Sequence, residues 1–176
     1  MNTKRIVLSG GPSSGKTTLI DTLSNQDFVV FEEISRSIIK SAQLNGVLQP
    51  FLENPIQFNI DVLKGRLKQY INAISKKSPV FYDRGVHDVV AYMNYAAQEI
   101  PKEFHDACEK CKYDLIFLLP PWKAIHVQDQ ERYETFEQAQ QVYEAIKATY
   151  KKYNFNFIEV PTGTVQDRVN FILKYL

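Results

Sequence analysis

The run Gly10-Gly11-Pro12-Ser13-Ser14-Gly15-Lys16-Thr17 decides the fold of this chain. It fits the pattern G-x-x-x-x-G-K-[ST] at every fixed position, and the apolar run Arg5-Ile6-Val7-Leu8 stands just before it. Glycines let a backbone curl until its N–H groups point at one anion, and a helix that follows adds the positive end of its dipole. The run therefore predicts a phosphate-binding loop between a buried strand and a helix.

The same pattern predicts roles for the last two residues of the loop. Lys16 would reach the β- and γ-phosphates of ATP or GTP, and the Thr17 hydroxyl would bind Mg²⁺. The residues expected to contact the nucleotide here are Gly10, Gly11, Pro12, Ser13, Ser14, Gly15, Lys16, Thr17 and Thr18.

Further apolar runs predict four more buried strands, at 28–31, 79–82, 115–119 and 155–160. Segments with helical patterns lie between and after the strands, at 16–24, 34–44, 54–74, 86–98, 101–111, 136–153 and 165–175. Continuous apolar strands that alternate with helices are typical of a parallel sheet covered on both faces. We therefore expect a three-layer α/β fold with a five-stranded parallel sheet.

The longest predicted helix begins at Asn54, which suits the N-cap, with Pro55 at the first helical position. Apolar residues recur along it at steps of three and four, which predicts one buried stripe. The residues of this stripe are Ile56, Ile60, Leu63, Leu67, Tyr70 and Ile74.

Charged side chains follow the second strand. Because ligands of an open parallel sheet bind beyond the carboxyl ends of its strands, Glu32 and Glu33 and then Arg36 stand where a substrate would bind. Glu33 and Arg36 share a helix face, so Glu33 could act as a general base while Arg36 holds it or the substrate. The alternative is an ordinary surface ion pair, which contributes little.

The third strand also ends in charge, at Asp83-Arg84-Gly85. Asp83 closes an apolar run and would contact Mg²⁺, and Arg84 would bind phosphate or substrate. Asp88, five residues further on, either binds substrate or caps a helix.

A polar segment around 123–135 follows the fourth strand, where a lid could close over a transferring phosphate. Arg132 in this segment would neutralise developing charge, as enzymes with such phosphate loops require. The alternative is a solvated loop charge.

The bulk composition fits a single domain over residues 1–176. Hydrophobic residues make up 44% of the 176 residues and charged residues 23%, as in ordinary globular chains. The net charge of +1 argues against a dedicated nucleic-acid binder. With neither a targeting pattern nor an apolar run long enough to span a bilayer, we expect a cytoplasmic protein. Cys108 and Cys111 are interpreted as ordinary reduced thiols.

With these motifs in place, the chain resembles the NadR-like P-loop AAA family, related to the ribosylnicotinamide kinase domain of bacterial NAD-regulatory proteins. Beyond the loop, the resemblance rests on the E-x-x-R and D-R-G motifs at the strand ends and on three further stretches, 118–122, 129–132 and 160–163. It implies strand order 2-3-1-4-5, with ATP and Mg²⁺ as ligands. It also implies that Glu33 is the substrate-side acid or base, Asp83 the carboxylate near Mg²⁺ and Arg132 the lid arginine, while Pro161 and Thr162 border the adenine.

Two functions remain open at this stage. The first is a kinase that transfers the γ-phosphoryl of ATP to a nucleoside-like or nucleotide-like small molecule. The second is a nucleotide-dependent switch, or an ATPase or GTPase module, that binds a protein or lipid partner. A guanine-binding N-K-x-D motif is missing from the sequence, which disfavours a conventional GTPase.

Overall fold

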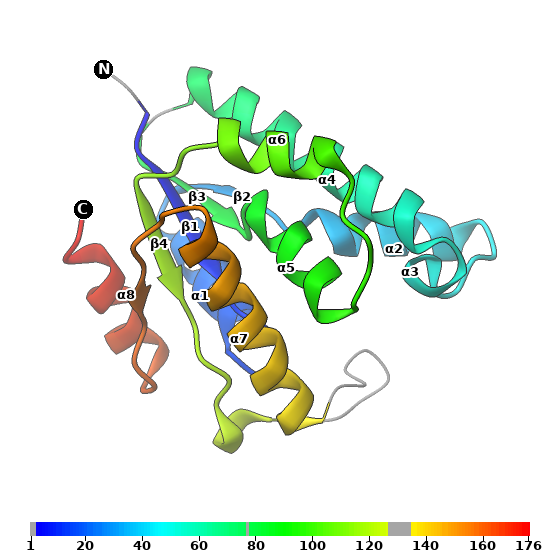
Figure 1. Ribbon diagram of the computed structural model, residues 1–176. Coiled ribbons are helices and arrows are strands. Elements are labelled where there is room, and N and C mark those ends of the chain that lie inside the picture. Colours follow the sequence, from blue (N-terminus) through cyan, green and yellow to red (C-terminus); the bar gives the residue numbers. More distant parts are fainter. Residues whose placement is uncertain (1–2, 77, 127–134) are drawn as a thin grey trace.

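The chain folds into a parallel sheet between two layers of helices (Figure 1). The structure, a computed structural model, describes residues 3–76, 78–126 and 135–176. The strands are β1 (Arg5–Ser9), β2 (Val29–Phe31), β3 (Val80–Asp83), β4 (Leu115–Leu118) and β5 (Ile158–Glu159). Their order in the sheet is β2-β3-β1-β4-β5, which confirms the order 2-3-1-4-5 and the three-layer α/β fold.

The helices alternate with the strands largely where the apolar periodicity predicts them. They are α1 (Lys16–Asn25), α2 (Ile34–Leu44), α3 (Pro50–Glu53), α4 (Pro55–Asn72), α5 (His87–Tyr95), α6 (Lys102–Lys110), α7 (Phe136–Lys152) and α8 (Val165–Leu173), with short 3₁₀ turns η1 (Ala73–Ser75) and η2 (Lys123–Ile125). The single turn α3 was not predicted. The fifth strand is shorter than its apolar run, because only 158–159 pair with β4.

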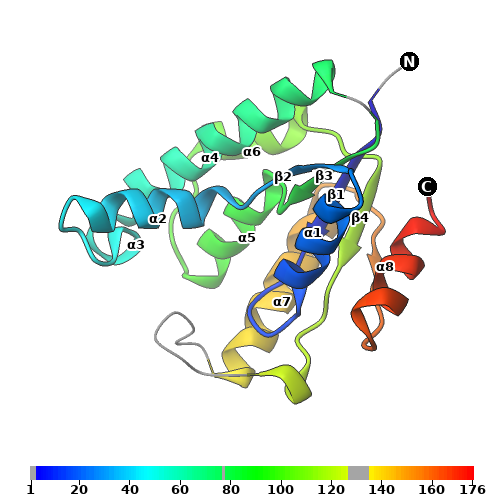
Figure 2. The same ribbon diagram turned by 180° about the vertical axis from the view of Figure 1, so that it is seen from behind.

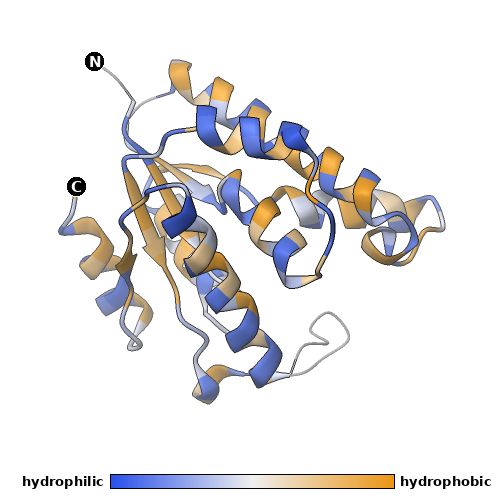
Figure 3. Ribbon diagram, viewed as in Figure 1, coloured by the Kyte–Doolittle hydropathy of each residue, from blue (hydrophilic) through white to orange (hydrophobic). Residues whose placement is uncertain are grey.

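Alternate residues of each strand face opposite helix layers, as the pleat of a strand requires. Val7 and Tyr82 point into a core with α4, α5, α6 and α7. Ile6 and Phe81 point into a second core with α1 and α8. Figure 1 shows α5 and α7 in front of the sheet, and Figure 2, seen from behind, shows α1 on the other face. Figure 3 shows the strands almost wholly apolar, as expected for a sheet buried on both sides.

The buried side of α4 differs from the predicted stripe. Ile56, in its first turn, is 43% exposed, and Ile74, which lies beyond α4 in η1, is 70% exposed. The helix instead buries Asn59 and Arg66 together with neighbouring apolar residues. Arg66 Nη1 donates to the Gly85 carbonyl at 2.9 Å and Asn59 donates to Gln98 at 2.8 Å. These hydrogen bonds satisfy polar groups that an apolar-periodicity argument assigns to solvent.

The fold gathers one edge of the sheet for binding. Because the strands are parallel, β1, β2 and β3 all end on the same side, next to the N-terminus of α1. Helices α2 and α3 and the start of α4 project from the sheet beyond β2 in both views (Figures 1 and 2). Among the described residues, none of the helices has the length and hydrophobicity that crossing a bilayer requires.

Candidate active site

The predicted phosphate loop joins β1 to α1. Gly15, the N-cap of α1, has a left-handed backbone with φ of 69°, which favours glycine. At Gly10, an added β-carbon would come within 2.7 Å of the Leu119 carbonyl oxygen, so only glycine lets the loop pass this close to the end of β4. The Ser14 hydroxyl donates to the Gly11 carbonyl at 2.8 Å and ties the loop together from within. The backbone is therefore curled as an anion site requires.

Lys16 and Asp83 form the buried centre of the site. The two residues are 5% exposed each, and the Lys16 ammonium donates to Asp83 in a short salt bridge. Register explains their meeting, because Asp83 pairs with Leu8 at the carboxyl end of adjacent strands. Burial and the Arg84 charge lower the pKa of Lys16, while Asp83 and Glu33 oppose that shift.

Glu33 stands at the N-cap of α2 and joins this pair to the next charges. Its carboxylate contacts Arg84 Nε at 2.7 Å, Arg36 Nε at 3.4 Å and Lys16 Nζ at 4.0 Å. The Ser35 hydroxyl also donates to it, at 2.7 Å. Burial alone would raise the pKa of Glu33, but Arg84, Lys16 and the Ser35 hydroxyl outweigh burial and hold that pKa well below its usual range. Glu33 is thus a carboxylate that stays ionised at any ordinary pH.

Arg84 is held from both sides. Its Nη1 donates to the Tyr92 hydroxyl at 2.6 Å, and the guanidinium carbon lies 4.9 Å from the centre of the Tyr92 ring. Burial disfavours the Arg84 cation, but Glu33 outweighs it and raises the pKa of Arg84 well above its ordinary value. The Arg84 backbone has φ of 71°, an uncommon conformation for a residue with a side chain, and such residues cluster at functional sites.

Arg36 links Glu33 to the phosphate loop. Its side chain is 61% exposed, and its Nη2 donates to the Thr17 hydroxyl at 3.3 Å. The structure therefore brings Lys16, Thr17, Glu33 and Arg36 together at one edge, as the motifs predict, with Asp83 and Arg84 beside them.

Asp88 does not fit the substrate-binding role predicted for it. It is fully buried and accepts hydrogen bonds from the Ser9 hydroxyl, from Gly85 N–H at 2.8 Å and from the Tyr150 hydroxyl at 2.7 Å. The bond to Gly85 N–H does not cap α5, because the N-cap of that helix is Val86, which lacks a side-chain cap hydrogen bond. The oxygens of Asp88 are already used by protein donors, which favours a structural role for this residue beneath the site over the predicted substrate contact.

The remaining predicted residues lie around this centre or outside the described residues. Thr18 is exposed on α1, and Pro161 and Thr162 are exposed between β5 and α8. Arg132 lies outside the described residues, as does most of the predicted lid segment at 123–135. At the start of that segment, His126 Nδ1 shares a 2.6 Å hydrogen bond with the Ser13 hydroxyl of the loop.

Sequence reasoning missed several contributors to the site. Tyr92 lies on α5, and no local spacing links it to Arg84, which stands before that helix. Ser35 stands inside the E-x-x-R motif itself. No local signal marks Arg168, which reaches the loop from α8, or Arg66 on α4.

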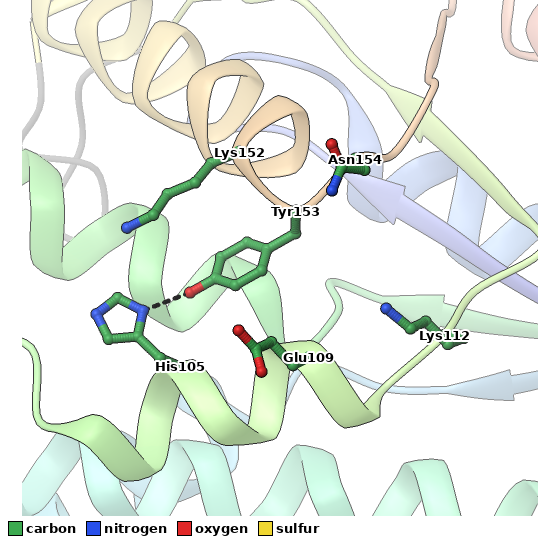
Figure 4. Close-up of a pocket in the computed structure, with 6 residues that line it drawn as sticks. All are labelled: His105, Glu109, Lys112, Lys152, Tyr153 and Asn154. Carbon is green, nitrogen blue, oxygen red and sulfur yellow. Dashed lines mark hydrogen bonds between the residues drawn. The ribbon is translucent and has the colours of Figure 1, made fainter.

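A separate pocket lies at the other end of the sheet (Figure 4). It measures about 350 Å³ between α6 and the end of α7, next to the segments that enter β4 and β5, and is lined by His105, Glu109, Lys112, Lys152, Tyr153 and Asn154. His105 Nδ1 and the Tyr153 hydroxyl are hydrogen-bonded at 2.5 Å. Ligands of parallel sheets bind beyond the carboxyl ends, so this hollow is not the predicted site.

The cysteines nearby are free and buried. Burial raises the pKa of Cys108 to about 12 and that of Cys111 to about 11, so neither thiol is activated as a nucleophile.

The fold and the loop define a three-layer P-loop α/β protein. The sequence profile of the AAA domain family matches residues 5–168, so the chain belongs to that family. This match confirms the resemblance to P-loop AAA proteins. A comparison with curated proteins gives no match.

Solved structures of kinases share the fold. Deoxyadenosine kinase from M. mycoides with bound dATP is 16% identical, with a TM-score of 0.70 over 97% of this chain and 98% of that one. NadR protein in complex with NR is 18% identical, with a TM-score of 0.74 over 98% of this chain and 49% of that one. Thymidylate kinase from Candida albicans is 17% identical, with a TM-score of 0.69 over 99% of this chain and 91% of that one. At these identities the likeness shows the fold alone.

Proposed function

We propose that this chain is an ATP-dependent kinase that phosphorylates a nucleoside-like or nucleotide-like small molecule. Its fold neighbours include a deoxyadenosine kinase, NadR and a thymidylate kinase, which supports this class over a switch that binds a protein or lipid partner. The observation that carries the proposal is the placement of Glu33. A carboxylate whose side chain is only 10% exposed, paired with Arg84 at 2.7 Å, stands 4.0 Å from the lysine of the phosphate loop.

A kinase needs a residue that holds the acceptor group of the substrate beside the donor phosphates, and Glu33 is suited to this role. Glu33 lies at the second strand end, next to the loop, where a substrate hydroxyl could donate to it. Because its pKa is held low, Glu33 orients that hydroxyl more than it removes the proton before transfer. A loose phosphoryl-transfer transition state requires little prior proton removal, so an orienting carboxylate suffices.

The cations of the site would stabilise the transferring phosphoryl group. Lys16 would exchange its salt bridge with Asp83 for contacts with the phosphate oxygens. Arg84, paired with Glu33, would lie on the side of the site where the acceptor binds. Arg36 closes the exposed side next to Thr17. Arg132, the predicted lid arginine, keeps that role in the proposal, and so do Pro161 and Thr162 beside the adenine.

The oxygen donors at this edge suit Mg²⁺. The Thr17 hydroxyl already accepts a hydrogen bond from Arg36, and Asp83 offers a carboxylate at the end of β3, so these two would hold the ion. Bound there, Mg²⁺ supplies charge that neutralises the phosphate oxygens.

ADP release from ATP and Mg²⁺ tests the proposal. The acceptor panel contains nicotinamide riboside, deoxyadenosine and thymidine monophosphate, together with other nucleosides and nucleotides. Release should rise sharply with one acceptor and fall on the order of a thousandfold in Lys16→Ala, because a preorganised phosphate contact is lost.

Flat, slow release across the panel would contradict the kinase. If ATP still bound tightly in that case, the nucleotide-dependent switch would become the better assignment. Mass spectrometry of the product would identify which hydroxyl or phosphate has been modified.

A further inference from the structure

Arg168 reaches the phosphate loop from the far end of the sequence. It lies near the start of α8 and is only 4% exposed. Its Nη2 donates to the Ser14 carbonyl at 3.0 Å, and an added β-carbon at Gly15 would lie 2.8 Å from its Nη1. The guanidinium thus lies directly against the Ser14–Gly15 peptide.

The charge of Arg168 is not compensated by a carboxylate in the described part of the chain. No described acidic group lies within salt-bridge distance of it, and its Nε has no acceptor among these residues. Burial lowers the pKa of Arg168. Keeping such a cation buried costs free energy unless another group offsets it. The described polar group that its side chain bonds is the peptide of the phosphate loop.

The geometry of that peptide shows what the contact does. In a trans peptide the C=O and the N–H point in opposite directions. Arg168 holds the Ser14 carbonyl outward, so the Gly15 N–H faces away from Arg168 and bonds no acceptor among the described residues. The Trp122 N–H similarly holds the preceding peptide, through the Ser13 carbonyl at 2.7 Å.

We propose that Arg168 is a positioning residue of the phosphate site. It fixes the Ser14–Gly15 peptide with its N–H turned toward a bound phosphate, and its charge polarises that peptide so that the N–H becomes a stronger donor. The cation also adds positive potential beneath the loop without touching the ligand. This inference rests on the proposed function only in that the loop binds a nucleotide phosphate.

The dissociation constant of Mg-ADP, measured by calorimetry, tests the role, because ADP carries the β-phosphate and is not turned over. Arg168→Met removes charge and hydrogen bond together and should weaken ADP on the order of 10- to 100-fold. Arg168→Gln keeps a hydrogen-bond donor without the charge, and Arg168→Lys keeps the charge without the planar guanidinium. The Mg-ADP dissociation constants of both variants should therefore lie between those of wild type and Arg168→Met. Since ground state and transition state use the same peptide, KM for ATP should rise while kcat changes little.

Arg5→Met is the matched control. Arg5 lies at the opposite end of β1, where its guanidinium stacks on Tyr70 at 4.5 Å. Its removal changes net charge equally but should leave the ADP dissociation constant unchanged. An equal loss of affinity in Arg5→Met would reduce the effect to net charge and overturn the role of Arg168.

The outcomes separate this role from the proposed function. A folded Arg168→Met variant with wild-type ADP affinity overturns the positioning role and leaves the kinase proposal standing. If Arg168→Met does not fold, equal affinity in Arg168→Gln and wild type overturns the role instead. A wild-type chain that binds no ADP overturns both proposals, whereas normal ADP binding without any acceptor overturns the kinase alone.

Discussion

The two ends of the sheet differ in how far their ionisable side chains are buried. At the carboxyl end, Lys16, Glu33, Asp83 and Arg84 have side chains at most 11% exposed and contact one another within a few ångströms. At the amino end, a pocket of about 350 Å³ lies between α6 and α7, but its lysines and Glu109 are exposed. The more open hollow is therefore not the one where charge is concentrated.

This difference shows which of the two is built for chemistry. Burying four charges costs several kilocalories per mole in desolvation, which mutual pairing only partly offsets. Clusters of buried charges are therefore found preferentially at functional sites. Exposed lysines around a surface hollow cost nothing and need no explanation. Buried ionisable groups at strand ends are thus a better guide to this site than the size of a cavity.

The largest expected effect is on turnover, and it comes from changing Glu33 at the carboxyl end of the sheet. Glu33→Gln should lower turnover by about 10²- to 10⁴-fold, because the orienting carboxylate is lost and Arg84 is left without its partner. The Mg-ADP dissociation constant should change by no more than a few fold. Steady-state kinetics and calorimetry on the same preparation measure both.

Glu32→Gln provides the matched control for that variant. Glu32 is the adjacent glutamate but is exposed, so its change should leave turnover at the wild-type level. If Glu33→Gln were equally active, the carboxylate would have no part in acceptor binding.

The next effect tests whether Asp88 supports the site or belongs to it. Asp88→Asn replaces one carboxylate oxygen with an NH₂ group, which donates and cannot accept a hydrogen bond. Either the Ser9 hydroxyl, or the Gly85 N–H and the Tyr150 hydroxyl together, then lose their buried acceptor. We expect a loss of about 2–4 kcal/mol in the free energy of unfolding, measured with urea. Asp106→Asn removes only a surface salt bridge to Lys102 on α6 and should change the free energy of unfolding by less than about 1 kcal/mol. A stable Asp88→Asn variant with a raised KM for the acceptor would restore the substrate-binding role.

A smaller effect depends on pH and concerns His87, which lies buried between the two ends. Its ring is enclosed by Tyr113, Tyr150, Tyr153 and Phe155, with centroids 4.8 to 5.8 Å away, and burial lowers its pKa from 6.5 to about 4. The unfolded chain binds a proton near pH 6.5 and the folded chain only near pH 4. Stability is therefore present above pH 6.5 and is lost as the pH falls, by roughly 2 kcal/mol at about pH 5.

The variant His87→Phe keeps the ring and removes the titration. Urea unfolding between about pH 5 and pH 7.5 should show a shallower loss of stability toward acid than in wild type. Equal slopes in His87→Phe and wild type would mean that the buried ring does not control the acid sensitivity.

Sequence reasoning could predict the carboxyl end because its residues sit at marked positions. The loop motif, the strand ends and the helix spacing of Glu33 and Arg36 each follow from local periodicity, and the parallel sheet brings them to one edge. The sheet order came from the family resemblance, because apolar runs alone do not say which strands are neighbours.

The rest of the site depends on tertiary packing. Arg168 and Arg66 come from helices whose orientation a single sequence does not fix. The sequence pattern of both segments is that of an ordinary amphipathic helix, so it does not mark either arginine as a site residue. The predicted apolar stripe of the long helix fails at Ile56 and Ile74, whereas Asn59 and Arg66 are buried because they bond Gln98, in the segment after α5, and the Gly85 carbonyl. For Asp88 the sequence leaves substrate binding and helix capping open, since only the packed core reveals its three donors.

The smallest expected effect concerns the amino-end pocket. Lys152→Ala removes an exposed side chain that has no salt bridge among the described residues and lies 5.8 Å from the Tyr153 ring. Turnover and ADP affinity should stay at wild-type values, and the free energy of unfolding should change by less than about 0.5 kcal/mol. The same assays used for Glu33→Gln measure this, with Lys102→Ala on the exposed face of α6 as control. A selective loss of turnover in Lys152→Ala would show that the open hollow communicates with the charged edge, and the contrast between the two ends would no longer separate structure from function.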